Sequence, residues 1–265
     1  MSDTEMLQQM IEAAQEIGRR VLAQPRPPKF RTMAELKSVF GDFDEPLQET
    51  LWQRLHALVP AAVSFDELEG ELPAGDVWII DALDGAVQYL HELQHWCVSL
   101  TLVRDREPLL AVLHSPPLQE TYAARRGGGA TRNGAPIAPA RKSELAAAFV
   151  ATSYPPFVGR LPRQVELAGR SLAVMLGAAG IVRNLGATSW QVADVAGGRI
   201  DAFWEYGVDD VNLLGAALIA REAGAVVTDA AGQPWRAGAG SILVAAPSLH
   251  ASLQALMPAD ANTST

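Results

Sequence analysis

The chain has 265 residues, of which 49% are hydrophobic and 19% are charged, and this composition excludes disordered, collagen-like and coiled-coil proteins. A formal net charge of −9 argues against general binding to nucleic acids or anionic membranes, because those ligands need a positive field. The single cysteine, Cys97, excludes an internal disulfide and a metal cluster built on cysteines. No leader peptide and no membrane-length apolar run is evident, so we expect a soluble, cytoplasmic protein.

Two amphipathic helices are predicted at the start of the chain. The first covers residues 6–21, where apolar side chains recur at helical spacing. In the second, Asp44 is a candidate N-cap, Pro46 suits the first turn, and a stripe of leucines continues to Leu58. We therefore expect the second helix to begin near Asp44.

Strands and helices follow in a mixed order. A short apolar strand at residues 77–80 is typical of strands buried on both faces, and Asn133-Gly134 suits a type I′ hairpin turn. The other predicted strands are 98–103, 109–114, 120–124, 149–152, 181–183, 200–205, one near Val226, and 242–245, and the other predicted helices are 87–93, 164–176, 189–196, 211–223 and 249–257. This pattern predicts a mixed α+β or α/β protein in two lobes, residues 1–143 and 144–265.

The most informative segment contains Asp81 and Asp84 directly after the apolar strand. Two carboxylates held together by a tight turn repel each other unless a cation lies between them. Mg2+ prefers such oxygen ligands, and a backbone carbonyl, here that of Leu83, often completes its coordination. The N–H groups of Gly85 and Ala86 at a helix start would suit a phosphate oxygen. The alternative is that Asp84 only caps the helix and Asp81 only ends the strand, and the spacing favours neither.

The segment Asp81-Ala-Leu-Asp84-Gly85 resembles the D-P-[IL]-D-G-T signature of the inositol monophosphatase family. Further similarities follow in the family's order and cover nearly the whole chain. The similar positions are Asp44, Glu67, His91, the loop Gly186-Ala187-Thr188, the strand ending at Glu205, and Glu222-Ala-Gly224. Around Glu67 the match is incomplete, because Phe65-Asp66-Glu67 lacks the glycine of the family's G-E-E motif.

The resemblance implies a layered α-β-α-β-α sandwich of the sugar-phosphatase type, usually a homodimer, that hydrolyses small phosphomonoesters such as inositol phosphate with Mg2+. Metal ions in such a site lower the pKa of a water molecule and neutralise the phosphate, so an acidic chain can bind an anionic substrate. Carried over by position, the implied metal ligands are Glu67, Asp81, the carbonyl of Leu83, Asp84 and Asn212; the catalytic positions are Glu67, Asp44 and Ala86; and the substrate-binding positions are Gly85, Ala86, Gly186, Ala187, Thr188 and Glu205.

Two departures from the family pattern affect positions with a role in catalysis or metal binding. Ala86 stands where the family has a threonine that helps to orient the attacking water, and Asn212 stands where it has an aspartate for a second metal. Two hypotheses follow. In the first, Asp209 or Asp210 supplies the missing carboxylate, and Asp209 is better placed because it lies at i, i+3 from Asn212. In the second, the catalytic site has decayed and the chain binds a ligand or a partner. Helix capping is the commoner role of aspartates at such positions. We expect metal binding to persist and turnover to be weak.

Overall fold

The computed structural model describes residues 1–25, 27–65 and 71–258. The helices are α1 (Asp3–Ala23), α2 (Met33–Leu58), α3 (Ala86–Leu90), α4 (Pro162–Ala178), α5 (Thr188–Ala196), α6 (Asp210–Ala223) and α7 (Pro247–Gln254). The strands are β1 (Val63–Ser64), β2 (Asp76–Asp84), β3 (Cys97–Arg104), β4 (Glu107–Ser115), β5 (Glu120–Arg125), β6 (Gly129–Arg132), β7 (Ala135–Pro136), β8 (Phe149–Thr152), β9 (Ile181–Arg183), β10 (Ala202–Tyr206), β11 (Val226–Thr228) and β12 (Ser241–Ala245).

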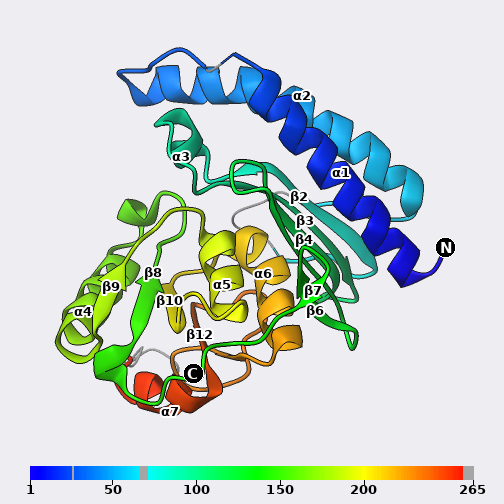
Figure 1. Ribbon diagram of the computed structural model, residues 1–265. Coiled ribbons are helices and arrows are strands. Elements are labelled where there is room, and N and C mark those ends of the chain that lie inside the picture. Colours follow the sequence, from blue (N-terminus) through cyan, green and yellow to red (C-terminus); the bar gives the residue numbers. More distant parts are fainter. Residues whose placement is uncertain (26, 66–70, 259–265) are drawn as a thin grey trace.

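Two sheets and three helical layers form an α-β-α-β-α sandwich (Figure 1). The first sheet has the strand order β1-β2-β3-β4-β5-β6-β7 and the second has the order β11-β12-β10-β8-β9. Helices α1 and α2 cover the outer face of the first sheet, α5 and α6 lie between the sheets, and α4 and α7 cover the second sheet. The layered fold predicted from the family resemblance is confirmed.

The first sheet carries a bulge where the two predicted metal ligands lie. Strands β2 and β3 pair antiparallel in regular register from Asp76 to Asp81, and the register then shifts before Asp84 pairs with Cys97. A bulge inserts an extra residue, bends its strand and re-aims the side chains, and bulges are common beside active sites. The irregularity therefore lets both aspartates of one strand end turn towards the layer between the sheets.

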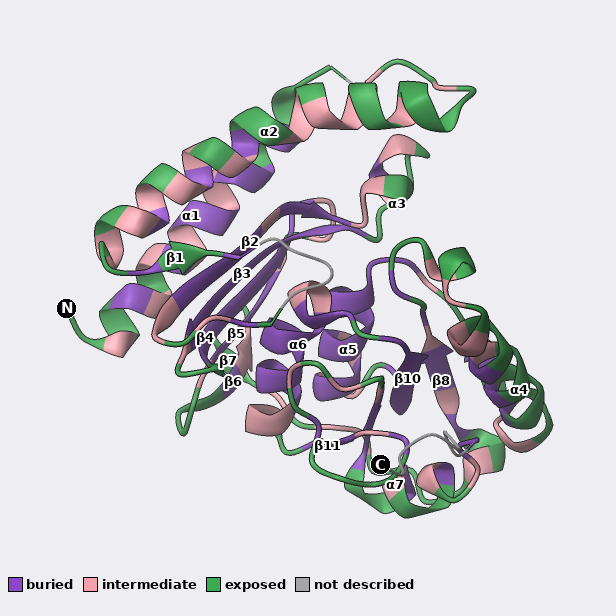
Figure 2. Cartoon of the chain, turned by 180° about the vertical axis from the view of Figure 1, so that it is seen from behind, coloured by how far each residue is buried: buried purple, intermediate pink, exposed green. Residues whose placement is uncertain are grey.

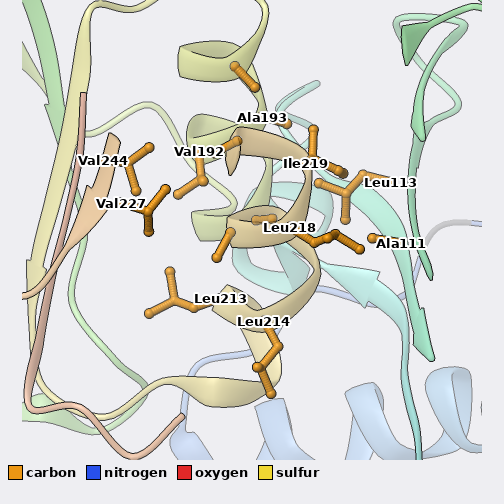
Figure 3. Packing of buried hydrophobic residues seen from close by; sticks show 14 of the residues in the cluster. Ala111, Leu113, Val192, Ala193, Leu213, Leu214, Leu218, Ile219, Val227 and Val244 are labelled. Carbon is orange, nitrogen blue, oxygen red and sulfur yellow. The ribbon is translucent and has the colours of Figure 1, made fainter. Parts of the chain in front are cut away.

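The apolar core between the sheets contains residues of both sheets and of α5 and α6. Figure 2 shows these two helices and the central strands as mostly buried, whereas the outer side of α2 is exposed. In Figure 3, α6 lies between Leu113 of the first sheet and Val227 and Val244 of the second. None of the helices in the described ranges is both long and apolar enough to span a bilayer.

The second helix begins earlier than predicted. Thr32 is the N-cap of α2, because its side-chain oxygen accepts a hydrogen bond from the N–H of Glu35 at 3.2 Å. The prediction that Asp44 caps the helix was wrong, since the helix starts at Met33 and both Asp44 and Pro46 lie in its interior. A proline inside a helix is unfavourable but tolerated where packing compensates. The predicted apolar stripe supplies that packing through buried Leu47, Leu51 and Leu55.

Most other predicted elements are confirmed, including β8 and β9 at both ends. Asn133 and Gly134 both have positive φ, 50° and 78°, as a type I′ turn requires. Helix α3 ends at Leu90, earlier than predicted, and Glu92 follows with a φ of 63°. Strand β7 ends at Pro136 and β8 begins at Phe149, so each sheet belongs to one of the predicted lobes, 1–143 and 144–265; their independence as domains stays a prediction.

Candidate metal and phosphate site

Asp81 and Asp84 lie on both sides of the bulge at the end of β2. The Oδ1 atom of Asp81 accepts a hydrogen bond from the N–H of Leu83 at 2.8 Å. Asp84 is buried, and its Oδ2 atom accepts a hydrogen bond from the hydroxyl of Ser189 on α5. The Sγ atom of Cys97 lies 3.8 Å from the same Oδ2 and 3.4 Å from the Ser189 oxygen. Asp84 is therefore tied to the layer between the sheets.

Carboxyl groups from separate elements raise one another's pKa values in this region. Burial raises the pKa of Asp81 well above its usual value, and the nearby charges of Asp84, Asp44 and Asp209 raise it further. Burial also raises the pKa of Glu205, as do the charges of Asp209 and Asp84. Like charges held together out of water disfavour the ionised form, and a bound cation reverses that effect. The end of β2, α2, β10 and the start of α6 thus bring carboxyl groups together.

Two of these carboxyl groups have oxygens that receive no hydrogen bond from the described residues. Among the described residues, nothing donates to either side-chain oxygen of Glu205 or to Oδ2 of Asp209. Glu205 is 1% exposed and Asp209 is 3% exposed. The other oxygen of Asp209 accepts a hydrogen bond from Nδ2 of Asn212 at 2.7 Å. A buried carboxylate without donors is costly, so these oxygens call for a proton or a cation.

The two aspartates before Asn212 have different roles. Asp209 occupies the N-cap position of α6 but makes no side-chain capping hydrogen bond. Asp210 accepts hydrogen bonds from the N–H of Gly238 on both carboxylate oxygens, at 2.9 and 2.8 Å. The structure therefore assigns Asp210 to holding a loop and leaves Asp209 as the candidate for the missing carboxylate.

The two predicted phosphate-binding segments lie side by side. Gly85 has a φ of 91°, and a Cβ there would lie 2.8 Å from the backbone oxygen of His95 and 3.1 Å from the Cβ of Ala187. A Cβ on Gly186, whose φ is 142°, would lie 2.6 Å from the Cβ of His95. Helix α3 begins at Ala86 and α5 follows directly on Ala187. The turn after β2 and the loop before α5 therefore approach each other closely around residue 95.

The polar residues of α5 hold this loop, and their roles are not evident from the sequence. Gln191 accepts a hydrogen bond from the N–H of Leu185 at 2.9 Å and donates to the carbonyl of Gly186 at 3.1 Å. The hydroxyl of Thr188 donates to Ser153 at 2.8 Å. The signal that could have revealed Ser189 and Gln191 is their place in a helix whose residues are nearly all buried, where polar side chains need partners.

The structure brings together the predicted residues Asp81, Asp84, Gly85, Ala86, Gly186, Ala187, Thr188 and Glu205, and it places Asn212 against Asp209. Burial raises the pKa of Asp44 to about 6, and its Oδ1 has no donor among the described residues. Asp44 also lines a cavity of about 530 Å3 together with Ser64 and Ile80. Glu67 lies outside the described residues, and the carbonyl of Leu83 stays a predicted ligand.

The donor chemistry of this site fits Mg2+, because buried carboxylate oxygens without donors are the ligands that this ion prefers. Across the described ranges, no three His, Cys, Asp or Glu side chains stand close enough together to hold one ion by themselves. Mg2+ commonly keeps several water ligands and takes only one or two carboxylates from the protein. The described residues therefore fit a site in which water and substrate oxygens complete the coordination.

Comparison with known proteins identifies the family. A model described as the inositol monophosphatase family matches residues 2–261. The Nus factor SuhB of Pseudomonas aeruginosa is 33% identical over 204 residues, covering 75% of this chain and 74% of that protein. The fructose-1,6-bisphosphatase/inositol-1-monophosphatase of Thermotoga maritima is 30% identical over 199 residues, covering 74% and 73%. An inositol monophosphatase structure from Anabaena matches with a TM-score of 0.80 and 25% identity, covering 96% of this chain and 95% of that chain. The chain belongs to the inositol monophosphatase family.

Proposed function

We propose that the chain is a Mg2+-dependent hydrolase of small phosphomonoesters, such as inositol phosphate or a related sugar or polyol phosphate. Membership of a phosphatase family supports this reaction class. The observation that carries the proposal is that the charge of Asp84, from the first sheet, raises the pKa values of two buried carboxyls, Glu205 of the second sheet and Asp209 at the N-cap of α6. Such a group of buried carboxyls beside two glycine turns suits metal-assisted binding of a phosphate.

Each group has a proposed task. Asp81 and Asp84, with the predicted ligand Glu67, would hold Mg2+, which when bound supplies a water of lowered pKa and positive charge for the phosphate. Ser189 holds one oxygen of Asp84 and so fixes the direction of the other. The backbone around Gly85 and Gly186 would orient the phosphate, because both segments lead into helices. Ala86 offers no hydroxyl to orient the attacking water, so we expect slow turnover.

The second candidate is a catalytically impaired member of the family that binds a ligand or a protein partner in the same cleft. Two observations favour it. Ala86 and Asn212 replace residues with chemical roles, and the similar protein of Pseudomonas aeruginosa carries the name Nus factor SuhB. The homodimeric state and the cytoplasmic location stay predictions under either function.

Phosphate release separates the two candidates. The assay takes a panel of phosphomonoesters with Mg2+ and compares the unchanged chain, Asp84→Asn, and the double variant Ala86→Thr with Asn212→Asp. Activity of the unchanged chain that disappears in Asp84→Asn supports the hydrolase. A silent parent with activity in the double variant indicates a decayed site. If all three are inert on every substrate, the binding role becomes the better account.

A further inference from the structure

We propose that Lys37 and Arg160, held against the ring of Phe157, bind a second anionic group of the substrate beside the proposed site. The inference deepens the proposed function and rests on it, because the phosphate to be cleaved would lie at the turns around Gly85 and Gly186. It narrows the substrate class to phosphomonoesters that carry a further phosphate or a carboxylate. The implied metal and substrate positions include none of the three residues that would bind this group.

The backbone at Phe157 is strained. Its φ of 58° lies in the left-handed region, which a bulky side chain rarely adopts because Cβ approaches the following carbonyl oxygen. The turn is held by the N–H of Val158, which donates to the carbonyl of Pro155 at 3.2 Å, and by the N–H of Arg160, which donates to the carbonyl of Phe157 at 2.9 Å. The side chain of Phe157 is 48% exposed, so core packing does not explain the strain. Strained residues are concentrated at binding sites, and here the strain coincides with charged neighbours.

Two cations from separate elements contact the ring of Phe157. Nζ of Lys37, on α2, lies 5.8 Å from the ring centroid, and Cζ of Arg160 lies 4.9 Å from it. Both distances allow a cation–π attraction, which restrains flexible side chains. Neither cation belongs to an ion pair of the described residues, whereas Arg170 on α4 pairs with Glu166 at 3.5 Å. In a chain with a net charge of −9, two such cations on one ring suit an anionic ligand.

The loop between β8 and α4, which carries the ring and one of the cations, is attached to the proposed site at two points. Ser153, directly after β8, accepts a hydrogen bond from the hydroxyl of Thr188 at 2.8 Å. A Cβ on Gly207 would lie 2.5 Å from Cγ of Pro155, and Gly207 directly follows β10, the strand of Glu205. The loop therefore lies against both the predicted substrate loop and the end of β10.

Helix α2 brings the other cation to the same side. Lys37 and Asp44 are seven residues apart in α2, so they lie on one face of the helix, about 10 Å apart along its axis. Asp44 lines the cavity of about 530 Å3 together with Ile80, the residue before Asp81. The face of α2 that carries Asp44 therefore also carries the contact with Phe157. An anion bound there suits a small substrate with charges at both ends.

Alkyl phosphonates are the probes, because their carbon–phosphorus bond is not an ester and binding is measured without turnover. Calorimetric titration of the full chain with Mg2+ compares hexylphosphonate, hexane bisphosphonate with a phosphonate at each end, and hexanoate carrying a terminal phosphonate. We expect a doubly charged probe to bind about tenfold more tightly than hexylphosphonate, since it makes an additional charge-assisted contact. The probe that gains more identifies the second group as phosphate or carboxylate.

The variants locate this gain in affinity. Lys37→Gln and Arg160→Gln should each remove most of it and leave the affinity for hexylphosphonate unchanged. The matched control is Arg170→Gln, which also removes one positive charge but at a position paired with Glu166, and it should keep the gain. Phe157→Leu keeps an apolar side chain without the ring and should lower the gain roughly two- to fivefold, as expected for cation–π contacts.

Equal affinity of the unchanged chain for the three probes overturns the inference, as does a failure to bind any of them. A gain that Arg170→Gln loses as fully as Lys37→Gln and Arg160→Gln also overturns it, because net charge then accounts for the effect. Urea unfolding checks that each variant is folded. Phosphate release is measured separately: a chain with the gain that hydrolyses no phosphomonoester retains this inference and loses the proposed function, and hydrolysis without the gain does the reverse.

Discussion

At the scale of single residues, Gly85 shows why the turn after β2 needs a glycine. Its φ of 91° lies in the left-handed region, and a Cβ would meet the backbone oxygen of His95 at 2.8 Å. Backbone strain and steric conflict therefore coincide at one position. Only a residue without a side chain lets the end of β2 approach the loop before α5.

Replacing Gly85 by alanine is expected to cost about 2–5 kcal/mol in the free energy of unfolding, because left-handed strain and overpacking add. The matched control is Gly224→Ala, which has a similar φ of 95° with nothing within 4 Å of its Cβ. That control should cost only about 1–2 kcal/mol, the strain alone. Urea unfolding measures the free energy of unfolding of both variants. Equal decreases in the two variants would show that the contact with His95 does not contribute to the cost at Gly85.

Ser189 is the residue that links the two layers at the site. Its hydroxyl donates to the buried carboxyl of Asp84. Ser189→Ala should reduce the free energy of unfolding by about 1.5–3 kcal/mol, because a hydrogen bond to a charged group is lost. Ser153→Ala removes the neutral partner of Thr188 and should cost about 0.5–1.5 kcal/mol. A smaller loss for Ser189→Ala than for Ser153→Ala in urea unfolding would contradict a charged acceptor.

At the scale of elements, the contact between α1 and β4 encloses a histidine. His114 is 8% exposed, and a Cβ on Gly18 of α1 would lie 2.9 Å from its ring. Its Nδ1 lies 3.1 Å from the carbonyl of Glu120 and 2.9 Å from the hydroxyl of Thr121. The Nδ1–H donates to that carbonyl. Burial lowers the pKa of His114 from 6.5 to about 4.

This histidine makes stability depend on pH. Between pH 6.5 and about 4 the unfolded chain binds a proton that the folded chain does not, so stability rises with pH and is lost as pH falls. The buried carboxyls of Asp81 and Glu205 act in the opposite direction, since their pKa values are raised. The comparison is therefore between the unchanged chain and His114→Gln. The variant should lose the contribution of His114, roughly 1–3 kcal/mol over this range. Parallel curves of unfolding free energy against pH would refute the role of His114.

At the scale of the whole molecule, α6 joins the two sheets. Its side chains reach Leu113 on one side and Val227 and Val244 on the other, in one continuous apolar cluster (Figure 3). The predicted lobes, 1–143 and 144–265, therefore share a core. The proposed site has the same origin, because Asp84 comes from one sheet and Glu205 from the other.

Removing a buried side chain from this shared core should lower the stability of both sheets together. Ile219→Ala removes a fully buried side chain and is expected to cost about 2–5 kcal/mol. Val165→Ala, at a position that is 46% exposed on α4, should change the free energy of unfolding by less than about 0.5 kcal/mol. Tryptophan fluorescence and far-ultraviolet circular dichroism should then report one coincident transition. Two separate transitions, with only one shifted by Ile219→Ala, would favour independent lobes.

The sequence determined the elements whose signals are local. β8 and β9 follow from short apolar runs, and the β6–β7 turn follows from Asn133-Gly134, because periodicity and turn chemistry act over a few residues. The start of α2 could not be predicted from Pro46, since a proline that suits a first turn is also tolerated inside a packed helix. The resemblance to the family could be read from Asp81, Asp84 and Gly85 because they lie within one segment of five residues.

The family resemblance already named Glu205 and Asp209 as candidates, and only the tertiary structure decided that Ser189 contacts Asp84 and which hydrogen-bond partners the other carboxyls have. Ser189, Glu205 and Asp209 come from α5, β10 and the start of α6, more than a hundred residues along the chain from Asp84. Their partners depend on how two sheets stack around a shared helical layer, and no local pattern encodes that distance. The sequence therefore determined that carboxylates are present in an acidic chain. Packing decided that, among the described residues, both oxygens of Glu205 and the Oδ2 of Asp209 receive no hydrogen bond, because burial and partners are properties of the folded chain.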